Sequence, residues 1–507
     1  MRINLFKIKL LLTVGVLSML QVFPLRVLAQ QQEIGNPHIK NYLPEEYKAH
    51  VQNFDIVQDT RGLMYFANFS GVLEYDGQNW RTIQTSLISQ VTSLAIDGNG
   101  TIYVGGRGEL GFLQADQFGN MQFISLTDSL ENNDRYFEKV INVQPTNKGV
   151  YFVTNVSVLF WDGNSFVSRK FDGQINSAFY VNQRLYFYES NIGLNYIENN
   201  QVYKVNTSNK LSKAIVIKAM IPFGVNEILI GTNSNGFLLL GENGITKFNT
   251  NFDNYLINNI LSCGILLSDG TLALGTERGG LVISHPDGSL KQIVNSGIQT
   301  NNISQLFVDN NNILWMALDN GIARVEVPSC FSFFDERKGI EGGVRQVIRN
   351  YGNLFFATNK GLFTFNNSVN SYRPVSGINS TCWSIIPDGS SIMAATSKGV
   401  FLVKNSQTKL IAPGFSIILF RSKIDSSTVY VGQMDGISKI QKVNGKWFYS
   451  GPIHGVSNEI SEIEEDNLGN LWLVSATRGL IRITSEGKVI PDFYDDEKIF
   501  GPSCMKV

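Results

Sequence analysis

Residues 302–325 read Asn-Ile-Ser-Gln-Leu-Phe-Val-Asp-Asn-Asn-Asn-Ile-Leu-Trp-Met-Ala-Leu-Asp-Asn-Gly-Ile-Ala-Arg-Val. Three short apolar runs, Ile303–Val308, Ile313–Leu318 and Ile322–Val325, are separated by two turn sequences. The first turn is rich in Asn and Asp, which hydrogen-bond their own main chain. The second ends in Gly321, which adopts positive φ without a steric penalty. The stretch predicts three consecutive strands, and because such a unit cannot bury both faces alone, we expect neighbours of the same kind.

The pattern recurs along the chain, and the repeat is its main organising feature. The third copy has Ser157 near the place of the second-turn glycine, and the fourth copy is degenerate. Second-turn glycines stand about 40 residues apart, close to the ~40–50 residues of a propeller blade; they are Gly280, Gly321, Gly361, Gly399, Gly436 and Gly479. The eleven copies cover residues 59–72, 97–111, 148–157, 183–194, 226–236, 269–281, 302–325, 352–362, 391–400, 428–437 and 466–480.

Between copies there is room for one further strand, such as residues 79–83 or 446–449. Four strands per unit is the architecture of a propeller blade. The rungs of a parallel β-helix are shorter, and a helical solenoid would need a helical apolar period. We therefore predict an all-β fold of β-propeller type, built from such four-stranded blades.

Residues around the second turn have definable physical roles. A side chain in place of the turn glycine would meet a penalty of order 1–2 kcal/mol for positive φ. The threonines that precede the turn can hydrogen-bond the loop backbone; they are Thr232, Thr276, Thr358 and Thr396. Small residues just before the turn would let adjacent blades approach closely; they are Ala67, Gly231, Gly275, Ala317 and Ala357.

Composition favours a large core and gives no electrostatic signature for nucleic acid or an anionic membrane. Of 507 residues, 43% are hydrophobic and 17% charged, and the formal net charge is -1, so disorder is not expected.

The N-terminus resembles a cleavable secretory signal, with Arg2, Lys7 and Lys9 before an apolar run, Leu10–Leu20, and cleavage expected near Ala29. A membrane anchor is the alternative, but the apolar run is shorter than the ~20 residues of a spanning helix.

No catalytic or metal-ligating constellation stands out. The four histidines, His38, His50, His285 and His454, are isolated, and the four cysteines lack metal-type spacing. Cys263 is expected in the core, and a Cys330–Cys382 disulfide stays open. Asp- and Asn-rich turns such as 309–312 could ligate calcium, although hairpin chemistry explains them without an ion. We therefore expect no cofactor and no metal.

The repeat resembles the two-component-regulator propeller repeat: Asp, a turn Gly, an aromatic-apolar strand, Gly-Thr, a turn and Gly-Leu. The best matches are residues 269–281, 309–322 and 466–480, and residues 53–80 resemble the opening of such sensor regions. The resemblance covers nearly the whole mature chain. It implies a periplasmic sensor region, commonly two stacked seven-bladed propellers followed by a β-sandwich, a membrane helix and a kinase or transcription-factor module. By that pattern, seven copies up to about Val325 would complete a first ring, and the remaining four cannot close a second one. The resemblance thus implies a complete seven-bladed β-propeller followed by an incomplete second propeller of about four blades, with a signal peptide (1–29), a first propeller (30–330) and a partial second propeller (331–507) as domains. A fragment or truncated product is favoured over a free-standing binder.

Ligand binding is expected at the mouth of a ring, where loops from several blades converge. Loops between second and third strands supply the charged candidates, and Trp80 and Trp161 could stack on a sugar ring. The alternative is that the charges are solvated and the tryptophans pack between blades. The candidate ligand-binding residues are Arg107, Glu109, Trp161, Glu277, Arg278, Lys360, Lys398 and Arg478.

The favoured function is a non-catalytic extracytoplasmic sensor, which the resemblance suggests would recognise a carbohydrate or other small ligand and act as a dimer. A secreted propeller lyase or glycosidase is the second possibility, and would need a carboxylate pair or a His/Tyr acid–base set at the mouth. A propeller that serves only as an interaction scaffold is the third. The expected location is the periplasm or the exterior, with any membrane contact made by a missing downstream segment.

Overall fold

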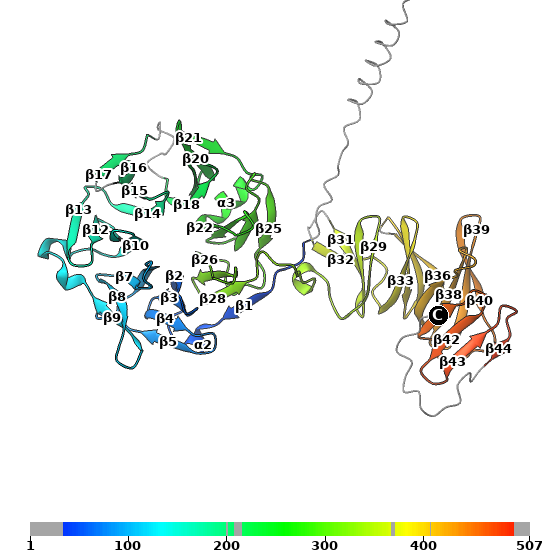
Figure 1. The fold of residues 1–507 in the computed structure, drawn as a ribbon. Coiled ribbons are helices and arrows are strands. Elements are labelled where there is room, and N and C mark those ends of the chain that lie inside the picture. Colours follow the sequence, from blue (N-terminus) through cyan, green and yellow to red (C-terminus); the bar gives the residue numbers. More distant parts are fainter. Residues whose placement is uncertain (1–33, 199–200, 207–214, 367–370, 406, 491–507) are drawn as a thin grey trace, which may run out of the picture. The chain divides into compact units, whose positions relative to one another are not determined.

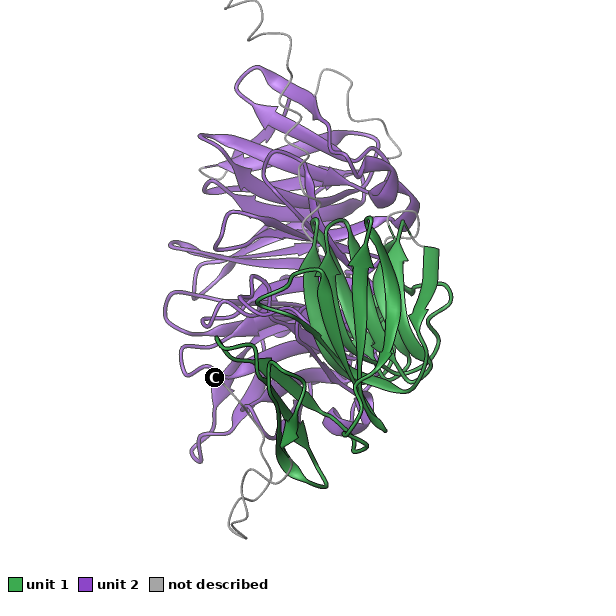
Figure 2. Ribbon diagram, turned by 90° about the vertical axis from the view of Figure 1, so that its right-hand side faces the viewer, with its two compact units in different colours: residues 1–35, 334–507 green, residues 36–333 purple. Residues whose placement is uncertain are grey.

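The computed structural model describes residues 34–198, 201–206, 215–366, 371–405 and 407–490 (Figure 1). The predicted signal peptide, Cys504 and the residues after 490 lie outside the described residues. The chain divides into two compact units (Figure 2). We call Asn36–Phe333 the large unit and the part that begins at Phe334 the small unit.

The large unit contains seven antiparallel four-stranded sheets within its described residues. Two short α-helices, α2 (Pro44–Tyr47) and α3 (Asp253–Asn259), and two 3₁₀ turns (Thr127–Ser129 and Asn132–Asp134) lie in the connections. The sheets are β2 (Asn53–Gln58), β3 (Met64–Asn68), β4 (Gly71–Tyr75), β5 (Trp80–Ile83); β6 (Val91–Ile96), β7 (Ile102–Gly106), β8 (Leu110–Ala115), β9 (Met121–Ser125); β10 (Val140–Thr146), β11 (Gly149–Thr154), β12 (Ser157–Trp161), β13 (Phe166–Lys170); β14 (Ile175–Val181), β15 (Arg184–Glu189), β16 (Gly193–Glu198), β17 (Gln201–Lys204); β18 (Ile217–Phe223), β19 (Glu227–Thr232), β20 (Phe237–Gly241), β21 (Gly244–Phe248); β22 (Leu261–Leu266), β23 (Leu272–Thr276), β24 (Leu281–Ser284), β25 (Leu290–Val294); and β26 (Ile303–Val308), β27 (Leu314–Leu318), β28 (Ile322–Val325) with β1 (Ile39–Tyr42).

The small unit contains four sheets of the same kind within its described residues. A 3₁₀ turn, Glu336–Lys338, precedes the first of them. The sheets are β29 (Val344–Asn350), β30 (Asn353–Thr358), β31 (Gly361–Asn366), β32 (Ser371–Pro374); β33 (Cys382–Asp388), β34 (Ser391–Thr396), β35 (Gly399–Lys404), β36 (Gln407–Ala412); β37 (Ser416–Arg421), β38 (Thr428–Gln433), β39 (Gly436–Val443), β40 (Lys446–Pro452); and β41 (Glu462–Glu465), β42 (Leu471–Ser475), β43 (Gly479–Ile483), β44 (Val489–Ile490).

The first strands of the seven large-unit sheets form a closed circle, as Figure 1 shows. Each of β2, β6, β10, β14, β18 and β22 contacts the next first strand, and β26 contacts β2. We call these seven the inner strands. The predicted all-β propeller fold is confirmed, and the expected strands of residues 302–325 correspond to β26, β27 and β28.

The last sheet of the large unit takes its fourth strand from the other end of the chain. β1 pairs antiparallel with β28, and Tyr42 lies opposite Ile322. The repeat by itself predicts each fourth strand downstream of its own copy, so this sheet departs from the pattern. Pairing between the two ends of the unit fastens the ring, because the seventh sheet cannot be completed until the N-terminal strand is in place.

The turn chemistry expected from the repeat is confirmed. Gly321 has φ +95° and Gly361 has φ +142°, and a Cβ at Gly361 would meet the carbonyl oxygen of Ile378 at 2.5 Å. The hydroxyl of Thr276 donates to the carbonyl of Gly280 at 2.8 Å and accepts from Gly279 N–H at 2.8 Å. The threonine therefore satisfies the buried backbone of the turn from both sides. Thr232, Thr358 and Thr396 make equivalent bonds.

The small residues before the turn do allow close packing of adjacent sheets. A Cβ at Gly231 of β19 would lie 2.5 Å from Leu261 of β22, and one at Gly275 of β23 would lie 2.9 Å from Ile303 of β26. The apolar cores lie between neighbouring sheets in this way, each shared by two of them. Neighbouring units therefore supply the burial that a single unit cannot achieve.

The structure contradicts one expectation for the cysteines, the Cys330–Cys382 disulfide. Cys263 is 4% exposed in the core between two sheets, as expected. Cys330 and Cys382 are both free, so the disulfide between them is wrong. Cys382 is fully buried in the small unit, where it packs as a small apolar side chain.

In the part of the chain that the structure describes, no helix combines the length and the apolar character that a bilayer-spanning segment needs.

Candidate functional site

Each inner strand of the large unit carries a register shift after its first residue. In β2 the shift falls between Asn53 and Asp55, and in β6 between Val91 and Ser93. A bulge of this kind places an extra residue in one strand and re-aims its side chain. The extra, second-position residues of six inner strands line one cavity: Phe54, Thr92, Ile141, Asn176, Lys218 and Ser304.

This cavity, which we call the mouth, has a volume of about 590 Å³. Its rim comes from turns between second and third strands and from the connections that lead into the inner strands. The expectation that such loops converge at one end of the ring therefore matches this geometry. The rim residues are Gln90, Arg107, Glu138, Lys139, Asn155 and Gln174.

Two ion pairs stand at the mouth. Arg107 Nη2 lies 3.6 Å from Glu138 Oε1, and both side chains are more than half exposed, so this pair is weak. Lys218 Nζ lies 3.2 Å from Glu277 Oε1, and the Lys218 side chain is only 28% exposed. Glu277 belongs to a turn between second and third strands, beside the exposed Arg278. The structure thus brings Arg107 and, through Lys218, Glu277 to the same end of the ring.

Third-position side chains of the inner strands connect adjacent sheets. Asp55 Oδ2 accepts hydrogen bonds from Leu94 N–H at 2.9 Å and from Ser93 Oγ at 3.1 Å. Ser93 Oγ in turn accepts from Val143 N–H of the following sheet at 3.1 Å. These bonds satisfy backbone groups that the bulge leaves without a ladder partner. The small unit repeats the arrangement, because Gln346 Oε1 accepts a hydrogen bond from Ile385 N–H of the following sheet at 2.6 Å.

In two other sheets, the third-position side chain of the inner strand has a buried polar atom without a hydrogen bond. Asn142 Oδ1 and Ser177 Oγ are buried polar atoms with no hydrogen-bond partner among the described residues. They directly follow the mouth residues Ile141 and Asn176. Unpaired buried polar groups of this kind are costly and mark places where a water or a ligand can bind.

Asp55 gives a pH-dependent prediction. Burial raises the pKa of Asp55 to about 6 from 3.8, although hydrogen bonds from Leu94, Ile56, Ser93 and Gln305 act to lower it. The folded state thus binds this proton more tightly than the unfolded chain, so the stabilisation is complete below pH 3.8 and is lost as pH rises through about 6. Relative to Asp55→Asn, the wild type should lose on the order of 2 kcal/mol across that window.

Urea unfolding of both proteins at stepped pH measures this difference. Other groups titrate equally in the two proteins, so the difference between their unfolding free energies isolates Asp55. Parallel curves over the whole window would contradict a raised pKa for this carboxyl.

Other candidate residues have structural roles or lie elsewhere. Glu109 is 2% exposed and accepts from Ser89 Oγ at 2.6 Å, which fixes the loop before β6. The Trp161 ring packs on Phe166 with centroids 4.7 Å apart, and Trp80 stacks on Tyr75 at 4.2 Å. Three candidates are exposed turn residues of the small unit: Lys360, Lys398 and Arg478.

The Asp-rich turns use their carboxylates within the hairpin. Asp309 Oδ1 accepts from Asn311 N–H and Ile313 N–H, both at 2.9 Å, and its Oδ2 accepts from the indole of Trp315 at 2.8 Å. Asp466 makes the equivalent bonds to its own loop and to Trp472. The aspartate therefore ties each turn to the aromatic residue six positions later, which accounts for the motif as turn chemistry.

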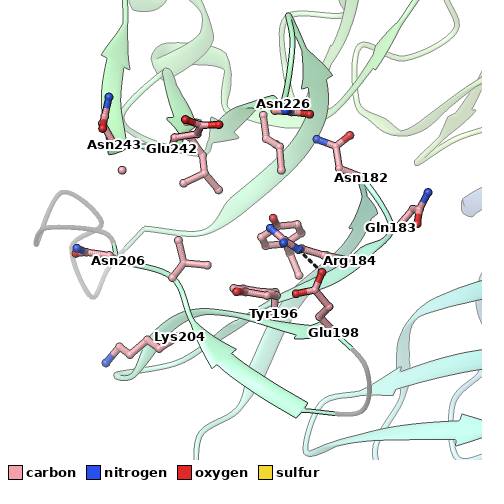
Figure 3. Close-up of a pocket in the computed structure, with 16 residues that line it drawn as sticks. Asn182, Gln183, Arg184, Tyr196, Glu198, Lys204, Asn206, Asn226, Glu242 and Asn243 are labelled. Carbon is pink, nitrogen blue, oxygen red and sulfur yellow. Dashed lines mark hydrogen bonds and ion pairs between the residues drawn. The ribbon is translucent and has the colours of Figure 1, made fainter.

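A second cavity of about 750 Å³ lies between the outer parts of sheets β14–β17 and β18–β21 (Figure 3). Arg184 Nε donates to Glu198 Oε1 at 3.0 Å at its wall, and the guanidinium lies over the ring of Tyr196. Lys204 and Glu242 are the other charged residues of its lining. The two positive and two negative side chains balance, so this cavity has no net charge.

Comparison with known proteins supports the fold. No family model and no curated protein matches the chain. The extracellular domain of a hybrid two-component system, BT3049 of B. thetaiotaomicron, matches with a TM-score of 0.67 at 16% identity, over 90% of this chain and 66% of that chain.

Two further solved structures match less well. The extracellular domain of the one-component system BT4673 of B. thetaiotaomicron has a TM-score of 0.47 at 17% identity, over 89% of this chain and 67% of that chain. Virginiamycin B lyase from Staphylococcus aureus has a TM-score of 0.45 at 11% identity, over 57% of this chain and 98% of that chain. The match to BT3049 has the highest TM-score of the three. This chain therefore shares its β-propeller fold with the extracellular domain of a hybrid two-component system.

Proposed function

We propose that this chain is the ligand-sensing propeller region of an extracytoplasmic signalling receptor of the two-component type. The observation that carries the proposal is the mouth, where second-position residues of six inner strands converge on one cavity of about 590 Å³. Cavities of this size accommodate small molecules. The ligand is a carbohydrate or another small polar molecule, and the signal passes to an output module outside this chain, with dimerisation as the means of transmission.

The fold shared with an extracellular domain of a hybrid two-component system supports this function. The secretory-type N-terminal sequence supports a periplasmic or extracellular location. The enzyme alternative requires two carboxylates or a His/Tyr pair at the mouth. Among the described residues that line the mouth, Glu138 is the one carboxylate, and none is His or Tyr. Glu277, at the same end of the ring, is engaged in an ion pair with Lys218, so this set of residues favours binding over catalysis.

Thermal shift of the secreted protein against a panel of glycan fragments tests the function. Binding members should raise the melting temperature in the wild type, because a ligand that binds only the folded state stabilises it. Ser304→Trp fills the mouth and should abolish the shift. Ser426→Trp, at an exposed turn of the small unit, should leave it unchanged. Turnover of a panel member by the purified protein would instead favour the enzyme.

A further inference from the structure

We propose that the ligand of the mouth is anionic, with a carboxylate or sulfate group, and that Lys218 is the residue that selects it. This inference rests on the proposed function, because it names the chemical class of ligand for the same site. It predicts acidic glycan fragments, such as oligogalacturonates or sulfated sugars, in preference to neutral ones.

Lys218 holds a position that no other inner strand gives to a charged residue. Its counterparts at the second position of the other six inner strands are uncharged: Phe54, Thr92, Ile141, Asn176, Ser262 and Ser304. A single ammonium group therefore projects from the ring of inner strands into the mouth. With 28% of its side chain exposed, Lys218 is partly dehydrated yet open to a ligand, which strengthens its interaction with an anion relative to bulk water.

The charge balance of the mouth points the same way. Its lining contains three cations, Arg107, Lys139 and Lys218, and one carboxylate, Glu138. With Glu277, which pairs with Lys218 at the same end of the ring, the cations still outnumber the carboxylates by three to two. Arg107 and Glu138 are separated by 3.6 Å and well exposed, so a ligand anion can compete for the guanidinium. The second cavity serves as an internal comparison, since its lining has two cations and two carboxylates. An excess of positive charge is thus a property of the mouth and not of every cavity in the large unit.

Glu277 sets how strongly Lys218 can act on a ligand. It lies 3.2 Å from Lys218 Nζ, and its backbone N–H is bonded to the carbonyls of Asn259 and Ile260. The turn thus fixes the backbone of Glu277 next to α3. A bound anion must share Lys218 with this carboxylate, so removing the Glu277 charge should strengthen anion binding. A purely structural ion pair would show no such effect on affinity.

The experiment measures binding of three probes to the secreted protein by isothermal titration calorimetry: trigalacturonate, neutral galactotriose and inorganic sulfate. The variants are Lys218→Met, Glu277→Gln and the control Lys291→Met. Lys291 pairs with Asp269 at the same 3.2 Å and is 30% exposed, but lies on β25, away from the mouth. It therefore controls for loss of a half-buried ion pair.

We expect the wild type to bind trigalacturonate, and sulfate more weakly, while galactotriose does not bind. Lys218→Met should weaken trigalacturonate binding about tenfold or more, the size of one charge-assisted hydrogen bond. Glu277→Gln should strengthen it, Lys291→Met should leave it unchanged, and raised salt should weaken it. Circular dichroism confirms that each variant folds.

Three outcomes overturn the inference, and the first of them separates it from the function on which it rests. Galactotriose or other neutral panel members binding at the mouth, sensitive to Ser304→Trp, with no preference for the acidic probes, would refute the anionic ligand and leave the sensor function standing. No binding of any probe or glycan panel member at millimolar concentration would remove support for both. Equal weakening by Lys218→Met and Lys291→Met would show that the Lys218 pair is structural only.

Discussion

Replacing Tyr42 by Ala is expected to lower the free energy of unfolding of the large unit by about 3–5 kcal/mol, the cost of truncating a large buried aromatic side chain. Tyr42 is 2% exposed and belongs to β1, the strand that completes the last sheet. Its ring stacks on Trp315 with centroids 5.5 Å apart and meets the edges of Tyr75 and Trp80 at 5.3 and 5.6 Å. The substitution therefore creates a cavity at the point where the two ends of the ring are fastened together.

Equilibrium unfolding in urea, followed by tryptophan fluorescence, measures the loss, since Trp315 and Trp80 both report on this cluster. Tyr203→Ala is the matched control. Tyr203 also stacks on an aromatic ring, Tyr196, at 5.2 Å, but it is 40% exposed on the outer strand β17. Tyr203→Ala should lower the free energy of unfolding by well under half as much as Tyr42→Ala. A similar loss in both variants would show that β1 contributes no more to the ring than an outer strand.

The repeat predicted most of the fold because its information is local. Within each copy, three strands and two turns lie consecutively, so alternation of apolar runs with Asn, Asp and Gly positions them directly. The turn glycines and the preceding threonines could also be assigned a role, because positive φ selects for glycine and a hydroxyl beside a loop can satisfy its backbone. Thr276 and Gly321 behave as expected.

β1 could not be predicted in the same way. Its four residues, Ile-Lys-Asn-Tyr, carry no repeat signature, and its partner β28 lies at the far end of the large unit. Nothing in the local sequence distinguishes such a strand from a linker. Only the requirement that the seventh sheet have a fourth strand would have suggested a search for one at the N-terminus.

The candidate site was predicted at the level of topology and not of individual residues. Convergence of the turns between second and third strands predicted a surface at one end of the ring, and Arg107 lines a cavity there; ligand binding at that cavity stays a prediction. Lys218, Asp55 and Ser93 were missed because they interrupt apolar strands, where a polar residue is read as an irregularity. The bulge in each inner strand is the feature that could have been used. A polar residue directly after the first residue of several inner strands would have indicated that these strands surround one axis and direct those side chains toward it.

Gly105→Val is expected to be the most damaging change in the packing between two sheets, with a loss of about 3 kcal/mol or more, at or above the upper end of typical overpacking costs. A Cβ at Gly105 of β7 would lie 2.5 Å from Val140 Cγ1 and 2.7 Å from Val140 Cβ on β10, the first strand of the next sheet. Val140 is fully buried, and its Cβ is fixed to the backbone, so rotation of the side chain cannot relieve the clash. The two sheets must move apart, which opens the core between them.

Gly98→Val controls for the loss of a glycine, since Gly98 lies in the exposed turn between β6 and β7 of the same sheet. A Cβ at Gly98 has no atom within 4 Å, and exposed substitutions of this kind change stability by less than about 0.5 kcal/mol. Gly105→Ala should fall between the two, because it adds one methyl group to the same contact. Urea unfolding of the three variants gives the series directly. If Gly105→Val were as stable as Gly98→Val, adjacent sheets would not depend on small residues for their approach, and the physical role assigned to this position of the repeat would be wrong.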